Sequence, residues 1–238
     1  MITILLKEIN EFLDSLIAYV VIGVFLTGIG LLTWIFPSTS VLDYGYASLE
    51  TLFSLGPYVF MFLIPAITMK SFTEEKKSGT IELLYTLPFK HHEIILGKFL
   101  AGFLLVIVSV LPTLIYYFSL SALGNPVGNL DTPGIIGSYV GLILLGGVFT
   151  AIGIFASALT QNQIVAFISS AFLCYFCYAG FSSLAEFGGS FASSVEKFGM
   201  LFHYNSLSRG VIDGTDLAYF FGLGFMLILL TVQILKRK

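Results

Sequence analysis

Charged residues are scarce in this 238-residue chain. Asp, Glu, Lys and Arg make up 11% of it, against about 25% in an average soluble domain, and its mean hydropathy is +0.95. This composition excludes an ordinary water-soluble domain and indicates that the chain folds in a lipid bilayer. The net charge of −3 provides no basic surface for nucleic acid, so no nucleic-acid partner is expected.

The sequence also lacks a nucleotide-binding motif. Gly97 and Lys98 are followed by Phe99, where a P-loop requires Ser or Thr. No Ser-His-Asp grouping and no pair of carboxylates in an obvious pocket can be recognised. We therefore predict that the chain is not an enzyme and holds no cofactor, and that any energy it uses comes from another chain.

Only two cysteines are present, Cys174 and Cys177, and both lie in an apolar run. Positions i and i+3 share one face of a helix, so two thiolates could bind a soft metal. Zinc and iron–sulfur sites want about four ligands, however, and no nearby His or second Cys pair supplies them. We interpret the two cysteines as small buried hydrophobic residues, with a metal site as the weaker alternative. His203 stands alone in the sequence.

Six uncharged stretches are long enough to cross the hydrocarbon core, which requires about 20 mostly apolar residues. They are residues 16–36, 52–69, 99–122, 135–159, 164–185 and 217–235. The predicted fold class is therefore all-α: a polytopic membrane protein whose residues 1–238 form one transmembrane domain. Gly147 with Ala151, and Gly153 with Ser157, are spaced for close helix packing in the fourth span. None of the spans has an ionisable residue at its middle, which disfavours a carrier coupled to protons or sodium.

The distribution of basic residues predicts the orientation. With six spans, nine of the eleven Lys and Arg residues fall on the side that holds both termini and the 70–98 loop. The positive-inside rule then places both termini in the cytoplasm. Residues 186–216 form an external segment, whose apolar residues at intervals predict one or two short helices.

Residues 1–15 are predicted to form an amphipathic helix. On a 3.6-residue period one face holds Ile2, Leu5, Leu6, Ile9, Phe12, Leu13 and Leu16, and the opposite face holds Lys7, Glu8, Asn10, Glu11 and Asp14. Such a helix lies along the membrane surface before the chain crosses. The alternative is that this segment simply extends the first span.

A dense polar segment, "EEKKSGTIELLYTLP", separates the second and third spans. The residues 71–74 match a capping box and predict a helix start there. Lys76 and Lys77 suit the last turn of that helix, and Gly79 can end it in the left-handed conformation. Thr80 can cap a second short helix, which Pro88 would end. Residues 71–90 thus have the features of a docking element, although a solvated surface charge at Glu75 or Lys77 and a purely structural bend at Gly79 and Pro88 remain alternatives.

Three stretches resemble the type-2 ABC exporter permeases. The run "EEKKSGTIELLYTLPFKHHEIILGKFLAG" is similar to the signature of that family, "SALTQNQIVAF" to its turn between the fourth and fifth spans, and "SLSRGVIDGTDLAYF" to the stretch before its last span. The resemblance covers nearly the whole chain. Within the family, the sequence most resembles the permeases associated with gliding motility in bacteria.

The resemblance implies a set of partners. The six spans would be half of a transporter, paired with a second permease subunit that is either a copy of this chain or a different one. Two copies of a separate ATPase would bind ATP and Mg. The N-terminal helix would be the connecting helix of the family, and residues 71–90 would be the coupling segment seated in a cleft of the ATPase. The residues carried over to that interface are Glu74, Glu75, Lys77, Gly79, Thr80, Leu84 and Pro88.

The function that this resemblance implies is ATP-driven export in support of gliding motility or an associated secretion system. One alternative is a copper-related or other maturation permease, for which Cys174 and Cys177 would be the distinguishing residues. The other is a membrane anchor or regulator that transports nothing and only holds its partners together.

Overall fold

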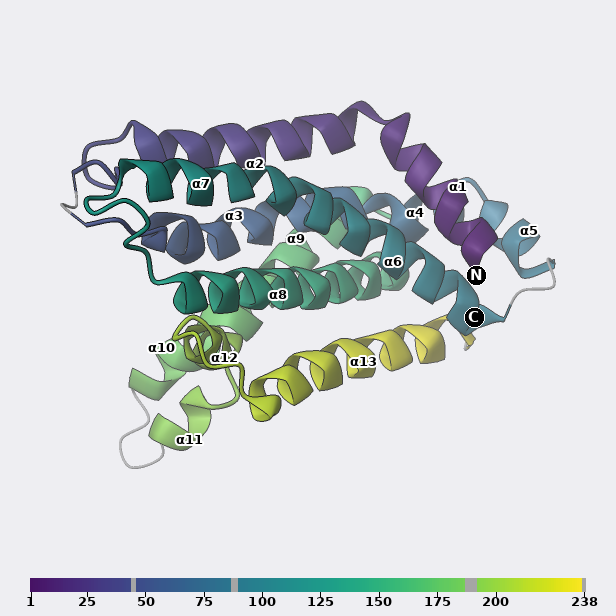
Figure 1. Cartoon of the computed structure of the whole chain (residues 1–238). Helices are drawn as coiled ribbons and strands as arrows, with labels where there is room; N and C mark the ends of the chain where they lie inside the picture. The colour runs from purple at the N-terminus through teal and green to yellow at the C-terminus, as the bar shows by residue number, and fades with distance from the viewer. Residues whose placement is uncertain (44–45, 87–89, 187–191, 237–238) are drawn as a thin grey trace.

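Helices form every regular element of the described chain, and no strand occurs within it (Figure 1). The computed structural model describes residues 1–43, 46–86, 90–186 and 192–236. The elements are α1 (Ile2–Leu13), α2 (Leu16–Trp34), α3 (Glu50–Thr68), α4 (Lys70–Lys77), α5 (Thr80–Thr86), α6 (His91–Val110), η1 (Leu111–Thr113), α7 (Leu114–Leu123), α8 (Thr132–Leu159), α9 (Gln163–Tyr175), η2 (Phe176–Gly180), α10 (Phe181–Glu186), α11 (Ala192–Glu196), α12 (Met200–Leu207) and α13 (Gly214–Lys236).

Six helical stretches are long and apolar enough to cross a membrane, which confirms the predicted all-α, six-span class. They are Leu16–Trp34, Glu50–Lys77, His91–Leu123, Thr132–Leu159, Gln163–Glu186 and Gly214–Lys236. The third stretch bends where Pro112 introduces the 3₁₀ turn η1, and the fifth contains the π-helical turn η2. A proline or a π-bulge is the usual cause of such a change inside a helix.

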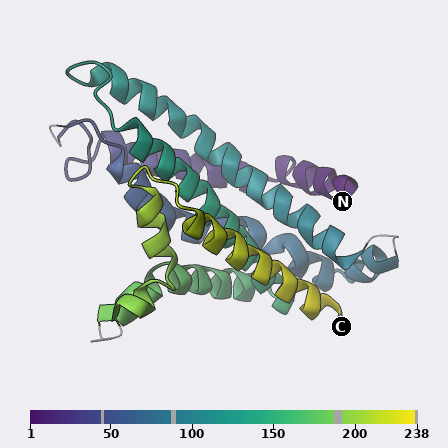
Figure 2. The same cartoon turned by 60° about the horizontal axis from the view of Figure 1, so that its bottom comes forward.

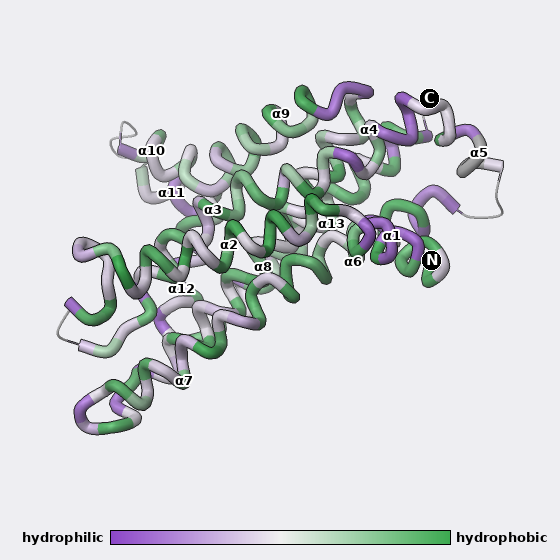
Figure 3. Tube along the Cα trace, turned by 90° about the horizontal axis from the view of Figure 1, so that it is seen from above, coloured by the Kyte–Doolittle hydropathy of each residue, from purple (hydrophilic) through white to green (hydrophobic). Residues whose placement is uncertain are grey.

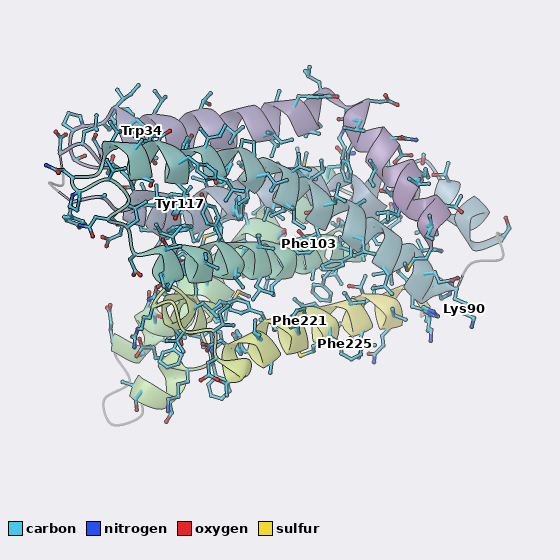
Figure 4. The ribbon with its side chains drawn as sticks, in the orientation of Figure 1. Trp34, Lys90, Phe103, Tyr117, Phe221 and Phe225 are labelled. Atoms are coloured by element: carbon cyan, nitrogen blue, oxygen red, sulfur yellow. The ribbon has the colours of Figure 1, made fainter. Side chains whose placement is uncertain are left out.

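Both ends of the described chain lie at the same end of the bundle, which we call the termini end (Figures 1 and 2). The helices α1, α4 and α5 lie there too, and α10, α11 and α12 lie at the opposite end, the loop end. Hydrophilic residues gather at both ends and hydrophobic ones between them (Figure 3). Trp34 and Tyr117 lie at the loop end and Lys90 at the termini end (Figure 4), as expected for groups that prefer the membrane–water boundary.

The helix α8 forms the centre of the bundle. It packs against α3, α6, α9, α12 and α13. In its most apolar part 72% is buried inside the protein, compared with 17% in the corresponding part of α13. Glycines make this contact possible: a Cβ on Gly153 would collide with the side chain of Thr68 in α3. In contrast, α13 carries the exposed residues Phe221 and Phe225 (Figure 4), a surface suited to lipid or to another subunit.

Two prolines interrupt the backbone hydrogen bonding of α3. Pro57 has no N–H to donate to the carbonyl of Phe53, four residues earlier. The buried hydroxyl of Tyr204 in α12 donates to that carbonyl instead, at 2.7 Å. A side chain of the 186–216 segment thus satisfies a polar group that a membrane helix leaves open.

The predicted helix start at Ser71 is wrong. Met69 joins α3 to α4 in the right-handed helical conformation, with its N–H donating to the Pro65 carbonyl at 2.9 Å, and no side chain caps α4. Ser71 is buried inside α4, so the segment continues the second span directly. At the other boundary, Ser15 is extended and accepts the Ile17 N–H, which separates α1 from α2.

A substitution at the contact between α8 and α12 tests this packing. A Cβ on Gly137 would overlap the backbone carbonyl of Leu207, which cannot rotate away. We expect Gly137→Ala to lower the free energy of unfolding by about 1–3 kcal/mol, measured as a lower melting temperature in detergent. Gly222→Ala is the matched control, because nothing lies within 4 Å of its Cβ position; equal melting temperatures would contradict the described contact.

Candidate functional site

The termini end contains a buried lysine. Lys98, in the second turn of α6, keeps only 2% of its surface exposed. A lysine is almost never buried unless it is paired, because taking its ammonium out of water costs several kcal/mol. Whatever surrounds Lys98 must therefore supply negative charge.

Two carboxylates from different helices surround the Lys98 ammonium. Its Nζ lies 2.6 Å from Oε1 of Glu8 in α1 and 2.8 Å from Oε1 of Glu75 in α4. Glu8 is 4% exposed and Glu75 14%. The ring of Phe72 lies 5.2 Å from the same nitrogen, within the range of a cation–π contact. One lysine therefore joins the N-terminal helix, the start of the third span and the end of the second.

Lys7 adds a second cation to this cluster. Its Nζ lies 3.4 Å from Oε1 of Glu75, 3.5 Å from Oε1 of Glu8 and 3.1 Å from Oε1 of Glu11. Partial burial alone would lower the pKa of Lys7, but the neighbouring carboxylates, Glu8 first, outweigh it and raise that pKa above its ordinary value. Lys7 and Lys98 together balance the charge of Glu8 and Glu75. We call these four residues the charge cluster.

A glycine allows α1 to reach the charge cluster. A Cβ on Gly97, next to Lys98, would lie 2.8 Å from Cγ2 of Ile4 and 3.4 Å from the backbone nitrogen of Leu5. Ile4 is buried there beside Ile94 and Ile95 of α6. The absence of a side chain at position 97 therefore lets the two helices touch, which places Glu8 within reach of Lys98.

A further contact fixes α4 on its other side. The ammonium of Lys76 donates to the backbone carbonyl of Ala158, in the last turn of α8. That carbonyl is one of the last in its helix, where no intrahelical donor is available. The helix α4 also packs against α8 and α9. Glu75 and Lys76 thus anchor α4 to two other spans, α6 and α8, and to α1.

The other predicted interface residues lie differently. Glu74, Lys77, Gly79 and Thr80 are exposed. Gly79 has a φ of 74°, which confirms the predicted left-handed end of the helix, and Lys76 and Lys77 occupy the last turn as predicted. The 71–90 segment therefore has an anchored side and an exposed side.

Thr80 is the first residue of α5, and its hydroxyl lies 2.8 Å from that of Ser78. Leu84 belongs to α5, but its side chain lies outside the described part of the structure. Pro88 lies outside the described residues altogether.

A cavity of about 600 Å³, lined by charged as well as apolar residues, opens between α1 and α4. Its charged lining residues are Lys7, Glu8, Glu11, Lys70, Glu74, Glu75 and Lys98. A cavity of this size admits water, which lowers the cost of keeping charges away from the bulk solvent on that side of the cluster.

The two cysteines lie far along the chain from this cluster, in the fifth span. Cys174 is buried at the end of α9, and Cys177 is partly buried in η2; both are free thiols. Within residues 1–43, 46–86, 90–186 and 192–236, no group of three or more His, Cys, Asp and Glu side chains is placed to hold a metal ion.

Three members of the charge cluster, Lys7, Glu8 and Lys98, were not among the predicted interface residues. Helical periodicity puts Glu8 on the polar face of α1, away from the apolar residues, yet Glu8 is buried. Lys98 was considered as a P-loop lysine and as one of the basic residues of the 70–98 loop, not as a buried cation. A lysine eight residues into an otherwise apolar helix was a usable signal, because such a residue requires an anionic partner.

This architecture, with six helices that could span a membrane and a polar segment anchored at their termini end, defines a polytopic membrane protein. The sequence matches the family described as "ABC-2 family transporter protein" over residues 2–234. The chain therefore belongs to the ABC-2 transporter family, whose members are membrane components of transporters that associate with an ABC ATPase. A search of curated proteins found no match.

Removing the central cation tests the charge cluster. Lys98→Met leaves Glu8 and Glu75 with the more exposed and more distant Lys7 as their shared cation, so we expect a loss of about 3–5 kcal/mol in unfolding free energy, measured as melting temperature in detergent. The triple variant Lys98→Met, Glu8→Gln, Glu75→Gln removes all three charges and should regain much of that loss. Lys77→Met, at an exposed lysine of the same segment, is the control; a melting temperature as low as that of Lys98→Met would refute the assignment.

Proposed function

We propose that this chain is the transmembrane subunit of an ATP-driven exporter and that residues 71–90 dock onto a separate ATPase. The observation that carries the proposal is the two-sided nature of α4. Glu75 and Lys76 hold it to α1, α6 and α8, whereas Glu74 and Lys77 are exposed. A segment that receives force from a partner requires both a free surface and a firm attachment to the moving helices.

The attachment suggests how a displacement would spread. If an ATPase pushes on α4, the ion pairs of Glu75 carry α6 with it through Lys98 and α1 through Lys7. Breaking these contacts inside the protein would leave buried charges unpaired. A joint movement of the helices therefore costs less free energy than a movement that separates them. The charge cluster therefore acts as the joint between the coupling segment, the connecting helix and the third span.

The partner ATPase would bind ATP and Mg. A second permease subunit, either a copy of this chain or a different one, would pair with this chain and cover part of the exposed apolar surface of α13 and α2. That surface includes Tyr19, Val20, Phe221, Phe225 and Leu229. Lipid would cover the remainder.

The physiological role that we propose is gliding motility or an associated secretion system in a bacterium. It rests on the overall resemblance of the sequence to the permeases associated with gliding motility, since the 74–102, 157–167 and 206–220 stretches resemble the family as a whole. The excess of lysine and arginine at the termini end supports an orientation in the inner membrane with that end in the cytoplasm. In this orientation the 71–90 segment faces the compartment that contains ATP.

A charge inversion on the exposed side of α4 tests the docking surface. We expect Lys77→Glu to weaken co-purification with the ATPase on the order of tenfold, because it places a repulsive charge at the interface, while the melting temperature stays unchanged. Lys236→Glu is the matched control: it makes the same charge change at an exposed lysine of the termini end, on α13. Equal retention of the ATPase by both variants would contradict the docking surface.

A complex of this chain with its ATPase, reconstituted in lipid, distinguishes an exporter from an anchor. For an exporter, the wild-type chain should stimulate vanadate-sensitive hydrolysis by the ATPase. An ATPase whose turnover is the same with and without this chain would favour the anchor or regulator instead.

Reporter fusions test the orientation. A reporter that is active only in the periplasm should be inactive when fused after Lys77 and active when inserted between α12 and α13, near Ile212. The reverse pattern would overturn the orientation and, with it, access of the 71–90 segment to a cytoplasmic ATPase.

A further inference from the structure

His203 does not stand alone at the loop end. Its Nδ1 lies 2.7 Å from Oδ1 of Asp216, in the first turn of α13, and its Nε2 lies 2.9 Å from the backbone carbonyl oxygen of Lys197. The imidazole therefore connects α12, on which it stands, to the start of the last span and to the chain before α12. The contact could not be recognised from the sequence, because Asp216 lies thirteen residues after His203 and in a different helix.

The two contacts of the imidazole determine how many protons His203 and Asp216 carry between them. A carbonyl oxygen can only accept a hydrogen bond, so Nε2 must carry a proton toward Lys197. The short contact between Nδ1 and Oδ1 then needs a proton of its own, on either atom, because two lone pairs at 2.7 Å would repel each other. The pair of His203 and Asp216 thus holds one proton between its members, either as an ion pair or as two neutral groups.

The surroundings favour a protonated pair. The ring of Tyr219 stacks on the imidazole with centroids 3.9 Å apart and an interplanar angle of 21°, and an aromatic face attracts positive charge. Asp216 is 3% exposed, and its Oδ2 finds no hydrogen-bond partner among the described residues. An isolated carboxylate would be costly in that position, so Asp216 depends on the proton that it shares with His203.

Several other titratable groups lie around α12. The elements α8, α13 and η2 pack against it, and their titratable side chains toward the loop end are Tyr139, Cys177, Tyr178, Asp216 and Tyr219. Tyr204 of α12 also bonds to α3, and Glu50 and Asp131 line a cavity with Tyr204, Asn205 and Ser208. Within the described part of the chain, Asp216 is the one acidic side chain within 4.0 Å of the imidazole nitrogens.

We propose that His203 and Asp216 form a proton-binding site that fastens the 192–213 segment to the last span. With the proton bound, the imidazole donates to both Asp216 in α13 and the Lys197 carbonyl before α12. When the proton leaves, the ring has one N–H for these two acceptors, so one of the two contacts is lost and the 192–213 segment is held less firmly. Because the form with both contacts carries the proton, the second contact contributes at low pH and disappears as pH rises. This site is independent of ATPase docking, which takes place at the other end of the molecule.

A carboxamide at position 216 provides a pH-independent version of the same contact. In Asp216→Asn the amide N–H can donate to Nδ1 of a neutral imidazole, while Nε2–H still donates to the Lys197 carbonyl. This arrangement needs no shared proton. The variant therefore keeps the geometry and removes the pH dependence, which a substitution that merely damages the fold would not do.

Hydrogen exchange of the full chain in lipid nanodiscs measures the effect. In the wild type, exchange in residues 200–207, normalised to the intrinsic rate and to residues of α8, should rise on the order of tenfold between about pH 6 and pH 9. In Asp216→Asn it should stay constant, and in His203→Ala it should be fast throughout. A wild type without this rise, or a rise of equal size in Asp216→Asn, would overturn the proposal.

A second measurement is made on the wild-type protein, so its result does not depend on whether a variant keeps the native contact. The chain has three histidines, so the signal absent from the ¹⁵N-histidine spectrum of His203→Ala identifies His203 in the wild type. Near pH 6 we expect Nε2 to be protonated and Nδ1 to show a strong hydrogen bond. A neutral ring that is protonated only at Nδ1 would contradict the proton count and refute the site.

Discussion

The attraction between one buried ammonium and two carboxylates determines how the termini end is assembled. Lys98 could not remain inside α6 without Glu8 and Glu75, and neither carboxylate could be buried without Lys98. Because these residues come from three helices, the requirement for charge balance becomes a requirement on their positions. The segment between the second and third spans is consequently held in place by electrostatics, whereas the interior of the bundle is held by the packing of apolar side chains around the glycines of α8.

The parts of the fold that depend on composition could be predicted from the sequence. Apolar runs of about 20 residues have few alternatives to membrane helices, and Gly79 is the residue type that ends a helix in the left-handed region, as its φ of 74° shows. The helix start at Ser71 failed because a capping pattern is local, whereas the hydrogen bonds of α3 continue through Met69. A favourable local motif cannot interrupt a helix whose next turn is already stabilised by burial.

The candidate site could be predicted only in part, for a different reason. The exposed residues of α4 follow from the polarity of one short segment. The charge cluster joins residues 8, 75 and 98, and its formation depends on the approach of α1 to Gly97. Periodicity assigned Glu8 to the polar face of an isolated helix, which is correct for a helix without neighbours. The partner of His203 could not be predicted for the same reason. The pairings of Glu8 with Lys98 and of His203 with Asp216 both depend on tertiary contacts, which the pattern of a single segment does not reveal.

The hydrogen bond from Tyr204 to the Phe53 carbonyl supplies α3 with a donor that Pro57 cannot provide. The helix contains a weak point at Pro57, and the donor that closes it belongs to α12, which His203 ties to the last span. At its other end the same helix continues through Met69 into α4. A bend at Pro57 would therefore alter the geometry at both membrane surfaces at once. A change in the position of α12 would therefore change the rigidity of α3, the helix that continues into α4.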